Sequence, residues 1–203
     1  MTQEENFNEQ ESLALIESMI KKAKNQFSEN GDSYLLWGWL VFFCSLAQFV
    51  LLNIVHYEKY YLVWMLTWVA AIYQIFDQRK KKNRAKVKTY TDEIIGYVWI
   101  AFAISFVLIG FNLSSHKLMD SSIWYAVILT LYGMPTFLSG IILRFPPLVA
   151  GGICCWVLAI VAVFVPYQYQ SFLLSAAMIV AWIIPGYKLR ARFKASKYNS
   201  AIE

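Results

Sequence analysis

The stretch Gln78-Arg-Lys-Lys-Lys-Asn-Arg-Ala-Lys-Val-Lys88 decides the fold, because it separates two apolar blocks that are each long enough to cross a bilayer. It holds seven of the eighteen Lys and Arg residues and no acidic residue. Lys and Arg accumulate in the cytoplasmic loops of membrane proteins, since a run of positive charge is costly to move across lipid. The stretch is therefore predicted to be a cytoplasmic loop, and it sets the orientation of every other segment.

The composition indicates that lipid is the solvent for much of the chain. Apolar residues make up 59% of the sequence and charged residues 15%, against roughly 45–50% and 25% in soluble domains. The net charge of +5 comes mostly from two basic clusters that membrane topology explains, so it does not indicate a nucleic-acid partner. The three cysteines lie in apolar segments without Cys-x-x-Cys spacing and are interpreted as packing residues.

The sequence divides into three regions. Residues 1–32 form an N-terminal segment, residues 33–187 a transmembrane domain, and residues 188–203 a basic tail. Within the first region, residues 11–29 carry apolar side chains three and four positions apart, which predicts an amphipathic helix. These apolar residues are Leu13, Ile16, Ile20, Ala23 and Phe27. This helix is expected to lie on the cytosolic membrane surface or to dock a partner.

The predicted fold class is an all-α membrane protein. It is a bundle of six transmembrane helices in three antiparallel hairpins, preceded by the amphipathic cytosolic helix. Each predicted span is close to the roughly 20 residues that cross the hydrocarbon core. The spans are 34–55, 60–76, 94–111, 123–143, 147–165 and 169–184. The connections after the fourth and fifth spans are very short, which brings the adjoining helices together.

The distribution of basic residues gives the topology. With the Gln78–Lys88 stretch inside, sixteen Lys and Arg residues face the cytosol and two, Lys59 and Lys117, face outward. This asymmetry predicts an even number of spans with both termini in the cytosol.

Polar residues inside the spans are few, and they fall on helix faces. No Lys, Arg, Asp or Glu lies near the middle of a predicted span, which argues against a proton-driven carrier. One interpretation of the polar residues is that they line a cavity in the outer half of the bundle; the other is that they hold helices together. The candidate cavity residues are Ser45, Gln48, Thr67, Gln74, Tyr125, Tyr132 and Ser139.

The fourth predicted span contains a candidate hinge. Pro135 lacks the N–H that bonds to the Leu131 carbonyl, and Gly133 removes a side chain from the same turn. A static kink is the alternative to a moving one.

The two histidines of the chain are weak candidates for a metal site. His56 and His116 fall at predicted outer ends, and a shift of sixty residues places one on the other. The same shift aligns Trp39, Phe42, Ser45 and Trp64 with Trp99, Phe102, Ser105 and Trp124, which suggests an internal repeat. Two histidines in outer turns are more often solvated, so no metal is assigned. The sequence contains no catalytic motif and no cofactor-binding motif that we recognise, and we expect a non-enzymatic protein without a cofactor.

Three stretches resemble an uncharacterised family of six-span bacterial inner-membrane proteins that begin with a cytosolic helix. They are Tyr34-Leu-Leu-Trp-Gly-Trp39, Leu131-Tyr-Gly-Met-Pro-Thr-Phe-Leu-Ser-Gly140 and Ile183-Ile-Pro-Gly-Tyr-Lys-Leu-Arg190. The resemblance spans most of the chain and implies a bacterial inner-membrane location and this architecture. The family has no assigned activity, so the resemblance transfers no functional residue.

Two functions remain open at this level. One is a membrane component that assembles with or regulates a protein partner at its cytosolic face, or with further copies of itself. The other is a small permease or channel for a neutral or lipophilic solute. A filled bundle would favour the first and a continuous polar cavity the second.

Overall fold

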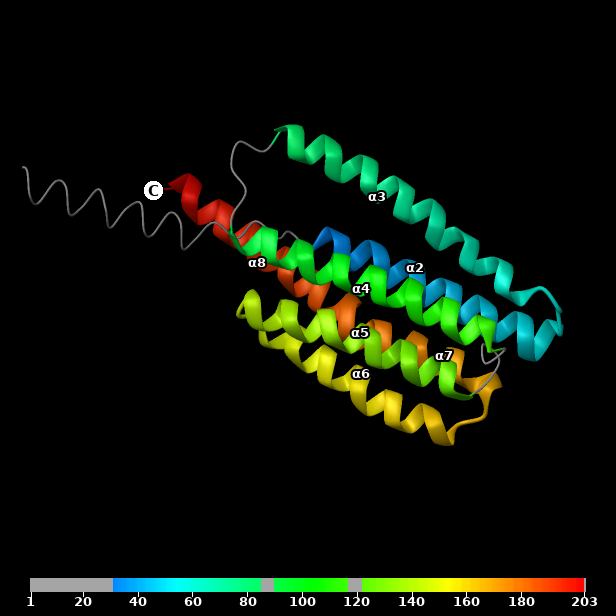
Figure 1. The fold of residues 1–203 in the computed structure, drawn as a ribbon. Coiled ribbons are helices and arrows are strands. Elements are labelled where there is room, and N and C mark those ends of the chain that lie inside the picture. Colours follow the sequence, from blue (N-terminus) through cyan, green and yellow to red (C-terminus); the bar gives the residue numbers. More distant parts are fainter. Residues whose placement is uncertain (1–30, 85–89, 117–121, 203) are drawn as a thin grey trace, which may run out of the picture.

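The computed structural model describes residues 31–84, 90–116 and 122–202, and these residues form helices and turns without a strand. Figure 1 shows the α-helices lying roughly along one direction. In chain order the elements are α2 (Asp32–Val50), the π-helical turn η1 (Leu51–Val55), the 3₁₀ turn η2 (Tyr60–Trp64), α3 (Met65–Arg84), α4 (Tyr90–Ser115), α5 (Ser122–Ile142), α6 (Pro146–Phe164), α7 (Tyr167–Met178), the π-helical turn η3 (Ile179–Ile183) and α8 (Ile184–Ile202). The predicted amphipathic helix lies outside the described residues.

Five helices in the described part of the chain are long and apolar enough to cross a membrane. They are Asp32–Val55, Glu93–Ser115, Ile123–Ile142, Pro146–Phe164 and Tyr167–Ser196. The second predicted span corresponds to η2 and the first part of α3, and this helix continues into the basic residues from Arg79 onward. The protein is therefore all-helical, and its apolar helices make it compatible with a multi-pass membrane protein.

The turn between α5 and α6 follows from its sequence. After α5 ends at Ile142, Arg144 adopts the left-handed conformation, at φ 48°, and the Phe145 amide donates to the Gly140 carbonyl at 2.8 Å. This is the usual way to satisfy the last carbonyls of a helix. Helix α6 then begins at Pro146, where the missing proline N–H costs nothing because the first amides of a helix have no intrahelical partner.

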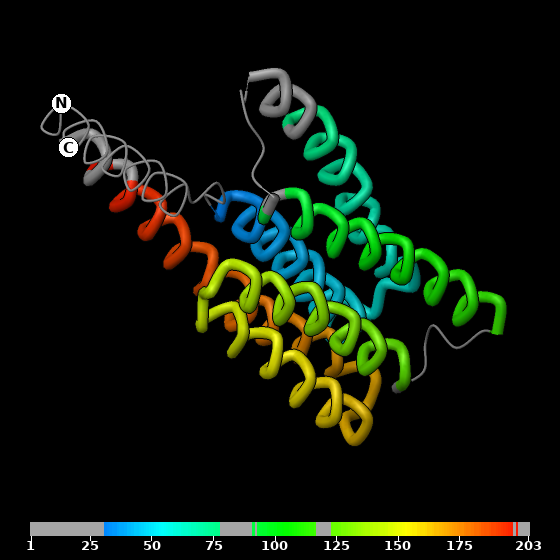
Figure 2. The backbone as a smooth tube through the Cα atoms, turned by 60° about the vertical axis from the view of Figure 1, so that its left-hand side comes forward, coloured from blue at the N-terminus to red at the C-terminus, as the bar shows by residue number. Residues whose placement is uncertain are grey.

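The last predicted span is longer than expected, since α7, η3 and α8 form one helical segment from Tyr167 to Ile202. The π-helical turn η3 lies just before Pro185, which lacks the amide that an α-helix needs at that position. The predicted tail from residue 188 thus continues the helix of the sixth span, and Figures 1 and 2 show it extending beyond the bundle.

The core lies between α2, α5, α6 and the α7–η3 segment. Tyr125, Leu129, Leu148, Leu174 and Trp182 are at most 1% exposed there. Glycines allow the backbones to approach closely: a Cβ atom on Gly152 of α6 would lie 2.7 Å from the Phe137 Cβ of α5. Small residues at helix crossings are typical of membrane bundles, where close packing replaces the hydrophobic effect between helices.

Not every helix packs chiefly on its neighbour in sequence. Helix α5 packs extensively on α6, and α4 packs on α5, but α2 packs chiefly on α7. Among the described elements, α3 contacts only η2 and α2 to any extent, and Figures 1 and 2 show it diverging from the other helices. The predicted hairpins correspond to α2–α3, α4–α5 and α6–α7, and of these only α4–α5 is a principal helix pair. The most extensive pair, α5–α6, joins the second predicted hairpin to the third.

Candidate functional site

Gln48 is the centre of a hydrogen-bonded group inside the bundle. Its side-chain oxygen Oε1 accepts one bond from the Trp64 indole and one from the Tyr125 hydroxyl, each at 2.7 Å. The side chain is 3% exposed. Because the donors come from η2 and α5, one amide oxygen joins α2 to two other segments.

Two further predicted residues on α2 and α3 also form interhelical hydrogen bonds. The Ser45 hydroxyl lies 2.8 Å from the Ser175 hydroxyl of α7. The Gln74 side-chain oxygen accepts a bond from the Trp37 indole. Thr67 instead donates to the Trp64 carbonyl at 2.6 Å, within its own helical segment.

The remaining two predicted residues lie elsewhere on α5. The Tyr132 ring packs edge-on against Trp182 with ring centroids 5.0 Å apart. Ser139 is fully buried, and its hydroxyl has no hydrogen-bond partner among the described residues. Apart from Gln48 and Tyr125, which bond to each other, the candidates belong to separate packing contacts, and their side chains fill helix interfaces more than they outline one cavity.

The candidate hinge lies between two tryptophans. Helix α5 runs without a break through Pro135. The Trp182 indole donates to the Thr136 hydroxyl at 2.8 Å, and the Trp156 indole donates to the Thr130 carbonyl at 3.3 Å. Trp156 also covers Gly133, where a Cβ atom would lie 2.3 Å from the indole nitrogen. The helix is thus bonded to neighbouring tryptophans on both sides of Pro135 in sequence, which favours a static helix.

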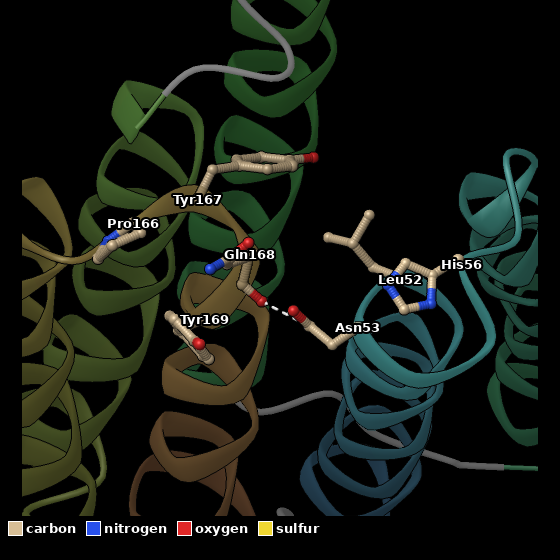
Figure 3. A pocket seen from close by; sticks show the side chains of 7 residues that line it. All are labelled: Leu52, Asn53, His56, Pro166, Tyr167, Gln168 and Tyr169. Atoms are coloured by element: carbon tan, nitrogen blue, oxygen red, sulfur yellow. Dashed lines mark hydrogen bonds between the residues drawn. The ribbon is translucent and has the colours of Figure 1, made fainter.

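A pocket of about 560 Å³ lies at the end of the bundle where α2–η1 finishes and α7 begins, and we call it the His56 pocket (Figure 3). It is lined by Leu52, Asn53, His56, Pro166, Tyr167, Gln168 and Tyr169. The Asn53 amide nitrogen donates to the Phe49 and Gln168 carbonyls, both at 3.0 Å, and so ties the two walls together. His56 is the one predicted site residue in this lining.

Sequence reasoning overlooked most of this pocket because its residues lie 110 positions or more apart on two chain segments. The available signal was an asparagine at the end of an apolar span, three residues before His56, and the polar turn that follows Pro166. His56 adopts the left-handed conformation, at φ 55°, where η1 ends.

The weak metal candidates gain no further ligands. Among the described residues, no group of three or more His, Cys, Asp and Glu side chains is placed to hold a metal ion. His56 Nδ1 lies 3.2 Å from the Ile54 carbonyl oxygen. His116 closes the end of α4, where its amide donates to the Asn112 carbonyl.

The residues aligned by the sixty-residue shift occupy different environments. Trp39 is 37% exposed and stacks on Phe43, whereas Trp99 packs against Trp182 at the edge of the core. Ser45 is buried and bonded to Ser175, while Ser105 is partly exposed. The structure thus gives the two segments different roles in packing.

Comparisons of this chain with protein-family models, with curated proteins and with solved structures find no significant match. The assignment of function therefore rests on the geometry described above.

Proposed function

We propose that the protein is a non-enzymatic component of a bacterial inner membrane that assembles with a protein partner or regulates it. In this proposal all six apolar segments cross the bilayer as three successive hairpins, with both termini in the cytosol. The five apolar helices and the sixteen-to-two distribution of Lys and Arg support this arrangement. The resemblance to an uncharacterised inner-membrane family is in agreement with it.

One observation carries the proposal: the polar side chains in the bundle bond to one another across helix interfaces. Gln48 accepts bonds from Trp64 and Tyr125, Ser45 is paired with Ser175, and Gln74 with Trp37. A solute pathway needs polar groups that face a passage, whereas these groups already satisfy each other. Mutual hydrogen bonding of this kind is the usual role of polar residues between membrane helices.

Helix α3 supplies a surface on which a partner helix can pack. Its side towards α2 carries Thr67 and Gln74, and its other sides expose large apolar residues between positions 65 and 76. These residues are Met65, Leu66, Trp68, Val69, Ile72, Tyr73, Ile75 and Phe76. A helix that contacts so little of its own bundle has room for a second protein or for another copy of this chain.

A permease for a neutral solute is the second candidate. It is favoured by the His56 pocket and by buried polar atoms that have no hydrogen-bond partner among the described residues, namely Ser139 Oγ, Gln170 Oε1 and Ser171 Oγ. Buried polar atoms without partners are uncommon and often mark sites with a role beyond packing.

Photo-crosslinking in native membranes tests the proposal. A photoreactive amino acid is placed at Trp68 of α3 and, in a matched variant, at Ile160 of α6, because the two side chains are 69% and 66% exposed. We expect a discrete protein adduct from position 68 and none from position 160. Adducts with lipid alone at both positions, together with solute uptake by proteoliposomes, would replace the partner role with the permease.

A further inference from the structure

We infer that the His56 pocket binds a neutral, hydroxyl-bearing ring ligand of the sugar class. This inference concerns the end of the bundle opposite Arg144 and does not depend on the proposed partner role. It is argued from the construction of the pocket, from the chemistry of its walls and from its position at the ends of the helices.

The pocket has walls that the fold holds in place. Its volume of about 560 Å³ falls within the roughly 300–1,000 Å³ of small-molecule sites. One wall is the last turn of the α2–η1 segment, and π-helical turns are often found at functional sites. Figure 3 shows this wall facing the start of α7, with the Asn53–Gln168 hydrogen bond between them.

Buried contacts fix the second wall. Gln170 is fully buried, and its amide nitrogen donates to the Ala162 and Val165 carbonyls, each at 2.7 Å. These bonds hold the turn at Pro166 against the end of α6. Tyr167 packs on Tyr125, with ring centroids 5.7 Å apart, and Tyr169 packs on Phe49. The lining residues are thus positioned before a ligand arrives, which lowers the entropic cost of binding.

The lining chemistry selects an uncharged ligand that forms hydrogen bonds. Among the residues that the structure describes, no Asp, Glu, Lys or Arg lines the pocket, so this lining offers no counter-charge to an ammonium or phosphate group. Both amide hydrogens of Asn53 are used by carbonyls, which leaves its Oδ1 as an acceptor. The Gln168 amide and the imidazole of His56 add donors and acceptors.

The apolar part of the lining narrows the class of ligand further. Leu52, Pro166 and the tyrosine rings offer apolar surface beside the amide and imidazole groups. A sugar ring combines hydroxyl groups, which both donate and accept, with a face of C–H groups. That combination matches a wall of mixed amide, imidazole and aromatic groups better than a purely apolar or a charged molecule does.

Two sources of such a ligand fit the position of the pocket. Because the pocket lies at the ends of membrane-length helices, it is level with lipid headgroups and open to dissolved solutes. The ligand is therefore either a free sugar or the sugar headgroup of a lipid, and the experiment separates these.

The test measures binding of maltose to the full chain in phosphatidylcholine nanodiscs by titration calorimetry and saturation-transfer NMR. We expect saturable binding that His56→Ala weakens at least fivefold and that His116→Ala leaves unchanged, because His116 directly follows α4 and is not among the residues that line the pocket. Asn53→Ala and Asn112→Ala form a second matched pair of variants. The side-chain amide of each asparagine donates to the carbonyl four residues earlier in the chain.

Dodecyl maltoside and octaethylene glycol monododecyl ether, both below their micellar concentrations, separate the two sources. If the maltoside binds more than tenfold more tightly than maltose and the ether does not bind, the ligand is a lipid-linked sugar. Equal binding of maltose and the maltoside identifies a free sugar. Three results would each overturn the inference. The first is that neither sugar probe binds saturably, and the second is that glucose 6-phosphate binds more tightly than maltose. The third is that His56→Ala and His116→Ala change the affinity equally.

Discussion

The hydroxyl oxygens of Ser45 and Ser175 lie 2.8 Å apart inside the bundle and join α2 to α7, although the two residues are 130 positions apart in the chain. Both residues are at most 2% exposed. Each hydroxyl is also within hydrogen-bonding distance of a carbonyl of its own helix, Val41 for Ser45 and Ser171 for Ser175. The pair therefore fixes the register of α2 against α7.

This pair gives the first prediction. In a double-mutant cycle of Ser45→Ala and Ser175→Ala, we expect a coupling free energy of about 0.6 kcal/mol, as is average for hydrogen bonds between membrane helices. Reversible unfolding in mixed micelles measures it. Ser105→Ala, at a partly exposed position of α4, is the control and should not couple to Ser175→Ala. If Ser105→Ala coupled equally to Ser175→Ala, the Ser45–Ser175 hydrogen bond would make no specific contribution to stability.

Gln48→Leu removes the acceptor shared by Trp64 and Tyr125. The leucine leaves the indole N–H and the phenol O–H without this partner in a buried region. We expect a loss of about 1–3 kcal/mol in the free energy of unfolding. Asn112→Leu, at an exposed asparagine whose amide bonds the Leu108 carbonyl of its own helix, is expected to be close to neutral in the same unfolding measurement. If Gln48→Leu left the free energy of unfolding unchanged, these hydrogen bonds would not be what holds the bundle closed.

Gly152→Ala and Gly96→Ala are expected to change the stability of the protein in opposite directions. A Cβ atom on Gly152 would lie 2.7 and 2.8 Å from the Cβ and backbone nitrogen of Phe137, so α5 and α6 must separate. Overpacking of this kind costs about 1–3 kcal/mol. A Cβ atom on Gly96 meets nothing within 4 Å, and alanine there removes the flexibility of glycine from α4. Comparison of the two unfolding midpoints tests this, and equal midpoints would contradict the close α5–α6 packing.

Pro135→Ala separates a static helix from a hinge. Trp156 and Trp182 contact α5 on either side of Pro135, and the proline is nearly fully buried. We therefore expect the unfolding midpoint to shift while crosslinking from position 68 stays at the wild-type level. Loss of crosslinking with an unchanged midpoint would instead identify Gly133 and Pro135 as a hinge.

The orientation in the membrane is tested with reporter fusions. An enzyme that is active only outside the cytosol should be silent when fused after Lys88 and active when fused after Lys117. The reverse pattern would invert the topology and place the His56 pocket on the cytosolic side.

The sequence by itself determined where the apolar helices lie, although α3 and the last helix continue beyond their predicted spans. Long apolar runs predict spans because lipid forces each segment to satisfy its own backbone hydrogen bonds, so the signal is local. The turn at Arg144 and Pro146 was readable for the same reason, since a helix stop and a helix start depend on a few adjacent residues. Basic residues from Arg79 onward likewise mark where the apolar part of α3 ends.

Only the tertiary structure decided which side chains meet. Gln48 and Tyr125 are 77 residues apart, and the two walls of the His56 pocket come from the end of one helix and the start of another. Helix α2 packs more extensively on α7 than on α3, although the chain joins it to α3. Such pairings depend on the rotation and tilt of each helix, which are set by the shapes of all interfaces together, and no local pattern of residues encodes them.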